Sequence, residues 1–245
     1  MVIIYYKEVT STMDIAHDYA SKNFPHGTII LADIQTEGRG RLRRKWISPE
    51  GGLWFSIILY PSIHLKGKID CLGILISVAV YKALDKFMKE KGILNFKWPN
   101  DIELNKKKVA GILLESVYEN SEIKYIIAGV GINLFVEQSY FEKYNIDATS
   151  LKDLMLIEDK LIVLKEIRSQ ILSHMADFPE NWDYVFRFYK SRFPYIGIMA
   201  TNKINEKEVK ILDIEGDGSI ILEEDKEIKK YSWGGISLEI KRITY

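Results

Sequence analysis

The chain of 245 residues lacks several features that would each indicate a particular class of protein. Its single cysteine, Cys71, has no partner for an internal disulfide, so nothing indicates an oxidising compartment. Its 34 lysines and arginines equal its 34 aspartates and glutamates, whereas a protein that binds nucleic acid through its phosphates usually carries a basic excess. Disorder is excluded as well, because 47% of the residues are hydrophobic and 12% are aromatic.

Long apolar runs are also missing. The longest cover residues 53–60, 72–80 and 126–136, and each is far shorter than the roughly 20 residues that a membrane-spanning helix needs. The N-terminal sequence MVIIYYKEV does not combine a basic start with a long apolar stretch, so it does not resemble a signal peptide. We therefore expect a cytoplasmic protein with no membrane partner.

The arginines are distributed unevenly, although the net charge is zero. Four of the eight arginines, Arg39, Arg41, Arg43 and Arg44, lie within six residues, and Lys45 follows them. A guanidinium group binds phosphate or carboxylate through two parallel hydrogen bonds, whereas lysine acts as a point charge. This concentration of arginine predicts an anion site in the segment.

Hydrophobic periodicity predicts helices among short strands in the first part of the chain. The longest helical patterns cover residues 70–91, which Gly92 would end, and residues 158–177. Cys71 lies in the first of them, where a buried structural thiol is the expected role. Strand-like stretches alternate with these patterns, which indicates an α+β fold.

The character of the sequence changes at Pro194. Five short β segments follow in about 50 residues, which is typical of a small barrel. We place a domain boundary near Phe193, so that residues 1–193 form the first domain and residues 194–245 the second.

The first segment with chemical character runs from Gln35 to Trp46, with the sequence QTEGRGRLRRKW. Its glycines allow close approach of the backbone to a ligand, and their amides can donate to anions. The arginines can neutralise a phosphate or carboxylate, and Trp46 could stack on a planar base. The alternative interpretations are an exposed solvated loop and a nucleic-acid patch.

Two further segments place charged residues at the ends of expected strands. In KWPND, residues 97–101, the acidic residue beside a Trp-Pro turn can hold Mg²⁺ on a nucleotide, but it can also form an Asx turn at a strand end. In KKKVAGILLE, residues 106–115, a lysine at the start of a strand can reach an oxyanion. The alternative there is a solvated basic hairpin tip.

The fourth segment is GVGINL, residues 129–134. It begins like a dinucleotide-binding fingerprint, but the third glycine and the following helix are missing, so a Rossmann interpretation is poor. Two glycines in a strand leave room for a flat ligand or another backbone against the sheet. Asn133 could then contact the edge of an adenine.

In this order, the four segments resemble those of the biotin protein ligases, the biotin–[carboxylase] ligase family. The resemblance spans nearly the whole chain and includes Ser11-Thr12, ATSL at residues 148–151 and WGG at residues 233–235. It implies that biotin is activated with MgATP to biotinyl-5′-AMP and transferred to one lysine of a biotin carboxyl carrier protein. It also implies a mixed sheet flanked by helices, followed by a small SH3-like β-barrel.

The resemblance assigns roles to individual residues. It implies that Lys108, Arg41 and Asp101 are catalytic, with Lys108 at the biotin carboxylate and the α-phosphate and Asp101 as the candidate Mg²⁺ ligand. The implied biotin-binding residues are Ser11, Thr12, Met13, Gln35, Gly38, Arg39, Gly40, Arg41, Lys108, Gly111 and Gly129. The implied ATP-binding residues are Arg39, Arg41, Trp46, Lys97, Asn100, Asp101, Lys108 and Asn133.

The chain departs from the family pattern at two points. Met13 follows Ser11-Thr12 where the family often has asparagine. Many bacterial members also carry an N-terminal winged helix that binds operator DNA, and only ten residues precede Ser11 here. We therefore expect a monofunctional ligase with no nucleic-acid partner and, because family members are often dimers, a homodimer.

Two other functions compete with this interpretation. A lipoate- or octanoate-type acyl ligase or transferase has a related catalytic fold, but it typically shows a different arginine–glycine motif. A non-enzymatic adaptor or nucleic-acid-binding protein would use residues 39–45 as its basic patch and the C-terminal part as its binding module.

Overall fold

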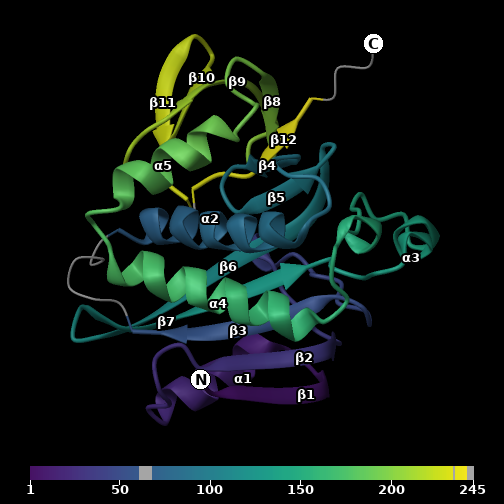
Figure 1. Cartoon of the computed structure of the whole chain (residues 1–245). Helices are drawn as coiled ribbons and strands as arrows, with labels where there is room; N and C mark the ends of the chain where they lie inside the picture. The colour runs from purple at the N-terminus through teal and green to yellow at the C-terminus, as the bar shows by residue number, and fades with distance from the viewer. Residues whose placement is uncertain (61–67, 234, 242–245) are drawn as a thin grey trace.

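The computed structural model describes residues 1–60, 68–233 and 235–241 (Figure 1). A seven-stranded sheet in the order β1-β2-β3-β7-β6-β5-β4 forms the larger part. It is mixed, because β1 and β2 run parallel while all other neighbours run antiparallel. Its strands are β1 (Ile3–Val9), β2 (Ile29–Gln35), β3 (Leu53–Leu59), β4 (Leu94–Lys97), β5 (Asp101–Leu104), β6 (Lys107–Glu119) and β7 (Glu122–Ile132).

Helices cover both faces of this sheet. Helix α1 packs over one face, where it forms a small core with alternate residues of β2, β3 and β7. Helices α2 and α4 lie side by side over the other face and contribute to the main core, and α5 packs against α2 (Figure 1). The helices are α1 (Thr12–Ser21), α2 (Ile69–Phe87), α3 (Gln138–Lys143), α4 (Lys160–Ala176) and α5 (Trp182–Ser191), with short 3₁₀ turns η1 (Arg41–Arg43) and η3 (Lys152–Leu154).

Helix α2 ends earlier than the sequence predicts. Its last residue is Phe87, and Met88 already has extended dihedral angles, so Gly92 is not the residue that ends it. The ammonium group of Lys91 instead donates to the carbonyls of Asp85, Lys86 and Met88, at 2.6, 2.8 and 2.6 Å. A lysine that folds back on the last turn satisfies carbonyls that would otherwise lack partners. Gly92 has a positive φ of 72° in the loop that follows.

The C-terminal part forms a separate antiparallel sheet of five short strands in the order β11-β10-β9-β8-β12. This confirms the predicted fold class, a mixed sheet flanked by helices plus a small β module. Gly234 of the WGG motif and residues 242–245 lie outside the described residues. The strands are β8 (Met199–Asn202), β9 (Lys207–Ile214), β10 (Ile220–Glu224), β11 (Glu227–Tyr231) and β12 (Leu238–Ile240).

Aromatic side chains fix this small sheet to the larger domain. The indole of Trp233 lies against Gly73 of α2, and its backbone N–H donates to Asp70 at 3.1 Å. Trp98, just after β4, donates from Nε1 to the carbonyl of Gly218 at 3.0 Å. The small sheet is therefore held against α2 and the β4–β5 edge. In the described part of the chain, no helix is both long and apolar enough to span a membrane.

The contact between Gly73 and Trp233 leaves no room for a side chain at position 73. A β-carbon at position 73 would lie 2.3 Å from the indole ring, so Gly73→Ala forces the two elements apart. Overpacking of this kind costs about 1–3 kcal/mol, which exceeds the roughly 1 kcal/mol that alanine adds to helix propensity. We expect a lower melting temperature in differential scanning calorimetry.

Gly216→Ala is the matched control, because a β-carbon at Gly216 meets no atom within 4 Å. Its melting temperature should stay close to that of the wild type. An unchanged or raised melting temperature for Gly73→Ala would show that Trp233 does not anchor the small sheet.

Candidate functional site

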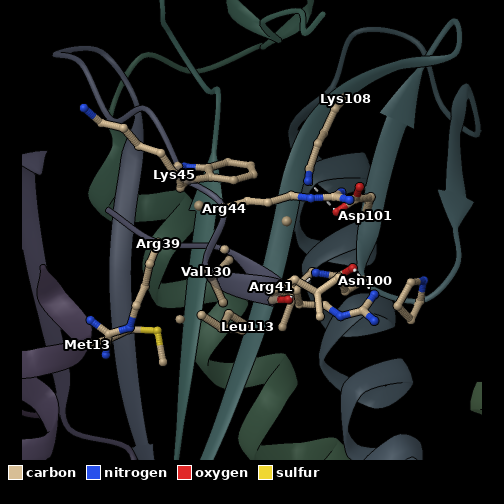
Figure 2. Close-up of a pocket in the computed structure, with 18 of the residues that line it drawn as sticks. Met13, Arg39, Arg41, Arg44, Lys45, Asn100, Asp101, Lys108, Leu113 and Val130 are labelled. Atoms are coloured by element: carbon tan, nitrogen blue, oxygen red, sulfur yellow. Dashed lines mark hydrogen bonds and ion pairs between the residues drawn. The ribbon is translucent and has the colours of Figure 1, made fainter. Parts of the chain in front are cut away.

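A cavity of about 230 Å³ lies where the four chemical segments of the sequence meet (Figure 2). It brings together residues that are up to 227 positions apart in the chain, from Ser11 to Leu238. Two of the predicted residues, Gly38 and Asn133, are not part of its lining. The predicted residues that line it are Ser11, Thr12, Met13, Gln35, Arg39, Gly40, Arg41, Trp46, Lys97, Asn100, Asp101, Lys108, Gly111 and Gly129.

A β-bulge brings Lys108 to this cavity. Ile102 pairs with Ala110 but Glu103 pairs with Lys108, so Val109 is the extra residue on β6. On a regular strand, residues three positions apart, such as 108 and 111, face opposite sides of the sheet. The extra residue of the bulge places them on the same side. Lys108 and Gly111 consequently both line the cavity.

Lys108 forms an ion pair with Asp101 across the cavity. Its Nζ atom lies 2.6 Å from Asp101 Oδ1 and 4.7 Å from the centroid of the Trp46 ring, and Figure 2 shows the two charged side chains pointing toward each other. Nearby, Lys97 lies 3.2 Å from the buried carboxylate of Glu103. The site therefore holds a lysine that is partly exposed, with a carboxylate beside it.

Trp46 lies flat against two glycines that face each other across the sheet. Gly111 on β6 pairs with Gly131 on β7, and a β-carbon on either would lie within 2.9 Å of the indole. The ring also contacts Trp54 edge to face, with 6.3 Å between centroids. Among the described residues, nothing accepts a hydrogen bond from the buried Nε1 atom of Trp46. Gly38 permits this placement, since a β-carbon there would meet the backbone oxygen of Trp46 at 2.5 Å.

Met13 forms an apolar floor at the other end of the cavity. Its sulfur would lie 2.7 Å from a β-carbon at Gly129, so the thioether occupies space that the glycine leaves free. Phe55, Leu113 and Val130 line the same region. The residue at which the chain departs from the family pattern is thus a buried part of the cavity wall.

A polar network surrounds this floor. The backbone N–H and the hydroxyl of Thr12 both donate to Gln35 Oε1, at 2.9 and 3.0 Å. Gln35 Nε2 in turn donates to Ser48 Oγ at 2.9 Å, and the Thr12 hydroxyl lies 2.8 Å from Ser56 Oγ. Because Gln35 Oε1 accepts two bonds, the orientation of its amide is fixed. No motif in the sequence indicated Ser48 or Ser56.

The hydroxyl oxygen of Ser11 accepts two hydrogen bonds. It caps helix α1 by accepting from the Met13 backbone N–H at 3.3 Å, a common role for serine at the start of a helix. It also accepts from Arg39 Nη1 at 3.2 Å. Since both lone pairs are used, the remaining role of this hydroxyl is to donate its proton.

Arg39 is bound to two carboxylates. Its Nε and Nη2 atoms donate to the two oxygens of Glu115 at 2.8 and 2.9 Å, and Nη1 donates to Asp14 at 2.6 Å. These interactions raise the pKa of Arg39, with the hydrogen bonds to Glu115 as the main cause. The pKa of Glu115 is lowered to about 2, chiefly by a hydrogen bond from His17 and then by Arg39, against the opposing effect of burial. The Arg39–Glu115 pair is therefore charged at neutral pH.

Arg41 and Arg44 reach the C-terminal module. Arg41 donates from Nη2 to the carbonyl of Ile236 at 2.8 Å, and Arg44 donates to the hydroxyl of Ser237 at 2.9 Å. Burial lowers the pKa of Arg41, although the charge of Asp101 opposes this shift. Ser237 and Leu238 also line the cavity, and no motif in the sequence indicated them.

Asn100 and Asn133 hold backbone segments beside the cavity. Asn100 Nδ2 donates to the backbone carbonyl of Ile112 at 2.6 Å, and the backbone carbonyl of Asn100 accepts from the Ile112 N–H at 2.9 Å. Asn133 lies just after β7 and donates from Nδ2 to the carbonyls of Lys108 and Thr149, at 3.3 and 3.1 Å. This accounts for the position of Asn133 outside the cavity lining.

Comparison with known proteins places this geometry in a family. Residues 5–133 match the model of the biotin/lipoate A/B protein ligase family. The bifunctional ligase/repressor BirA of Bacillus subtilis (strain 168) is 34% identical over 249 residues, covering 96% of this chain and 74% of its own. The biotin–[acetyl-CoA-carboxylase] ligase of Paracoccus denitrificans is 37% identical over 105 residues, or 43% of each chain.

A solved structure is similar over almost the whole length. The biotin protein ligase from Aquifex aeolicus in complex with biotin and ATP has a TM-score of 0.81 and 29% identity, and the match covers 98% of this chain and 99% of that one. Since the family model matches more than half of the chain and the structural likeness extends to the C-terminal sheet, this chain belongs to the biotin/lipoate A/B protein ligase family.

Proposed function

We propose that this protein is an ATP-dependent ligase that converts biotin to biotinyl-5′-AMP and transfers the biotinyl group to a lysine of a biotin carboxyl carrier protein. The proposal rests on the cavity. One end of it has apolar side chains and hydrogen-bonding groups, and the other end has the Lys108–Asp101 pair. The Aquifex aeolicus ligase that it resembles over 98% of the chain was solved with biotin and ATP bound.

The end of the cavity near Met13 suits the biotin ring system. A ureido ring offers a carbonyl acceptor, and the Ser11 hydroxyl is left to donate. The sulfur-containing ring is apolar and would lie on Met13 and Leu113. The carboxylate at the end of the valeryl chain would then extend toward Lys108.

The first reaction joins two anions, and cations must offset their repulsion. The biotin carboxylate attacks the α-phosphorus of ATP, so that a new oxygen–phosphorus bond forms while the bond to pyrophosphate breaks. Lys108 would exchange its contact with Asp101 for the carboxylate and the α-phosphate. Positive charge that is already in place stabilises the charge that develops in the transition state. Arg41 lines the same cavity and would add to this field.

The donor set suits a Mg²⁺ ion that is held mainly by phosphates. Mg²⁺ is commonly bound through one or two carboxylates together with substrate phosphates and water. Asp101 supplies one carboxylate at the cavity, and the described residues contain no group of three His, Cys, Asp or Glu that would form a complete protein site. Such an ion would neutralise part of the triphosphate charge.

The second reaction consumes the adenylate. The neutral amine of the acceptor lysine attacks the acyl carbon and a carbon–nitrogen bond forms. The bond from the acyl carbon to the phosphate oxygen breaks, AMP leaves with that oxygen, and the nitrogen loses a proton. The mixed anhydride hydrolyses readily in water, so the loop of residues 38–46 would protect it by covering the cavity. We further propose that the enzyme acts in the cytoplasm, where MgATP is available, and that it forms a homodimer.

The arginine cluster does not favour the adaptor or nucleic-acid interpretation. Arg39, Arg41 and Arg44 all donate to protein groups, which leaves fewer of their N–H groups for phosphates. A lipoate ligase is the closer rival, because the family name covers both activities. Isotope-labelled biotin and lipoate, each incubated with MgATP, would separate the two. We expect a labelled adenylate from biotin, and an adenylate from lipoate alone would refute the proposal.

Lys108→Ala tests the catalytic assignment. Removal of the ammonium group leaves the carboxylate and the α-phosphate without their shared cation, so single-turnover release of pyrophosphate should slow by about 10²–10³-fold. Lys107→Ala is the matched control, because Lys107 is the exposed neighbour on β6 and does not line the cavity. Near-normal adenylation by Lys108→Ala would remove Lys108 from the mechanism.

Gly131→Ala tests whether Trp46 contributes to the binding of ATP. A β-carbon at position 131 would lie 2.5 Å from Trp46 Nε1, so the indole must leave its place on the sheet. Stacking of an aromatic side chain on a base contributes about 1–3 kcal/mol. We expect the KM for ATP to rise about tenfold, with a much smaller change in the Kd for biotin from calorimetry. A selective loss of biotin affinity would instead place Trp46 at the acyl end.

A further inference from the structure

Glu115 closes the segment KKKVAGILLE, and the proposed reaction gives it no role. On β6 it comes two positions after Leu113 and four after Gly111, so its side chain faces the same side of the sheet as these cavity-lining residues. Its side chain is about two thirds buried, with 32% exposed. Its negative charge is therefore largely removed from water and requires a partner.

Arg39 provides the link between Glu115 and that loop. All three nitrogens of its guanidinium group donate to protein acceptors, in a two-pronged contact with Glu115 and in single contacts with Asp14 and Ser11. Its positive charge is thus matched by two carboxylates. Arg39 is therefore better suited to anchor the loop than to bind an anionic ligand.

The anchor joins three elements around the acyl end of the cavity. Glu115 belongs to β6, while Asp14 and Ser11 belong to α1 and its cap. His17 on α1 places Nε2 2.8 Å from Glu115 Oε2, the oxygen that also accepts from Arg39 Nη2. Figure 2 shows Arg39 extending from the loop toward Met13 on α1. Glu115 thus lies between the helix and the loop and contacts both.

We propose that Glu115 is a positioning residue for biotin, acting through Arg39. It holds the loop of residues 38–46 over the acyl end, and it keeps Arg39 in the place where it donates to Ser11. Because Ser11 then accepts from both Arg39 and the Met13 N–H, its hydroxyl proton is directed to the ligand. This inference rests on the proposed function, since it takes the ligand acceptor to be the ureido carbonyl of biotin.

A purely structural ion pair would behave differently. Loss of a partly buried pair that only stabilised the fold would lower the melting temperature and leave the Michaelis constants unchanged. A positioning role instead predicts a selective effect on biotin, with the nucleotide end of the cavity unaffected. It also predicts that the effect of Glu115 disappears when Arg39 is absent.

Glu115→Gln is the central variant, because glutamine keeps the shape of glutamate and loses its charge. We expect the KM for biotin to rise at least about tenfold, while the KM for ATP and the melting temperature stay close to wild-type values. Glu115→Asp should recover part of the loss. Glu119→Gln is the matched control, because Glu119 lies on the same strand and pairs with Lys124 at the exposed hairpin end.

A double-mutant cycle with Arg39→Ala tests the route of action. If Glu115 acts through Arg39, the double variant has the same KM for biotin as Arg39→Ala alone. Independent, multiplicative effects of the two substitutions would overturn the proposal. So would an unchanged KM for biotin in Glu115→Gln, or a loss of thermal stability with no change in KM.

Limited digestion with trypsin provides a readout that does not depend on substrate. The loop contains several Arg and Lys bonds, and mass spectrometry identifies which are cut. We expect faster cleavage within residues 39–45 in Glu115→Gln than in the wild type or Glu119→Gln, and equal rates would refute the anchor. If the wild type forms no adenylate from biotin, the proposed function fails, whereas the cleavage rates still report on the loop.

Discussion

The pairing of β6 with β7 is the constraint on which the site depends. Its register sets Gly111 opposite Gly131 and Leu113 opposite Gly129, which creates two places where a side chain can lie flat on the sheet. Trp46 occupies the first and Met13 the second. A shift of one residue would turn every side chain of a strand to the other face. The two ends of the cavity therefore exist only in this register.

The basic residues around the cavity have different functions because they have different partners. Arg39 is bound by Glu115 and Asp14, and Arg41 and Arg44 contact the segment before β12. These three arginines hold the loop between the larger domain and the C-terminal sheet. Lys108 pairs with the carboxylate of Asp101, which a substrate can replace. We infer that the loop arginines mainly shape the site and that Lys108 acts on the reacting groups.

The sequence predicted which segments carry the chemistry but not how their side chains pair. The helices expected over residues 70–91 and 158–177 and the short strands expected after Pro194 depend on local patterns, and the structure has α2, α4 and five short strands there. The contacts of Arg39 with Glu115 and of Arg41 with Ile236 join residues far apart in the chain, and they follow from the docking of whole elements. Lys108 reaches the cavity through a bulge at Val109, which no composition signal marks. The predicted stop at Gly92 was wrong, because Lys91 satisfies the end of α2 earlier.

Binding of biotin and ATP should move Lys108 from Asp101 to the junction of the two reactants. A crystal structure of this chain with biotin and a non-hydrolysable ATP analogue tests it most directly. We expect Lys108 Nζ to lie within hydrogen-bonding distance, about 3.2 Å or less, of both the biotin carboxylate and an α-phosphate oxygen. A complex in which Lys108 stays paired with Asp101 and contacts neither reactant would contradict it.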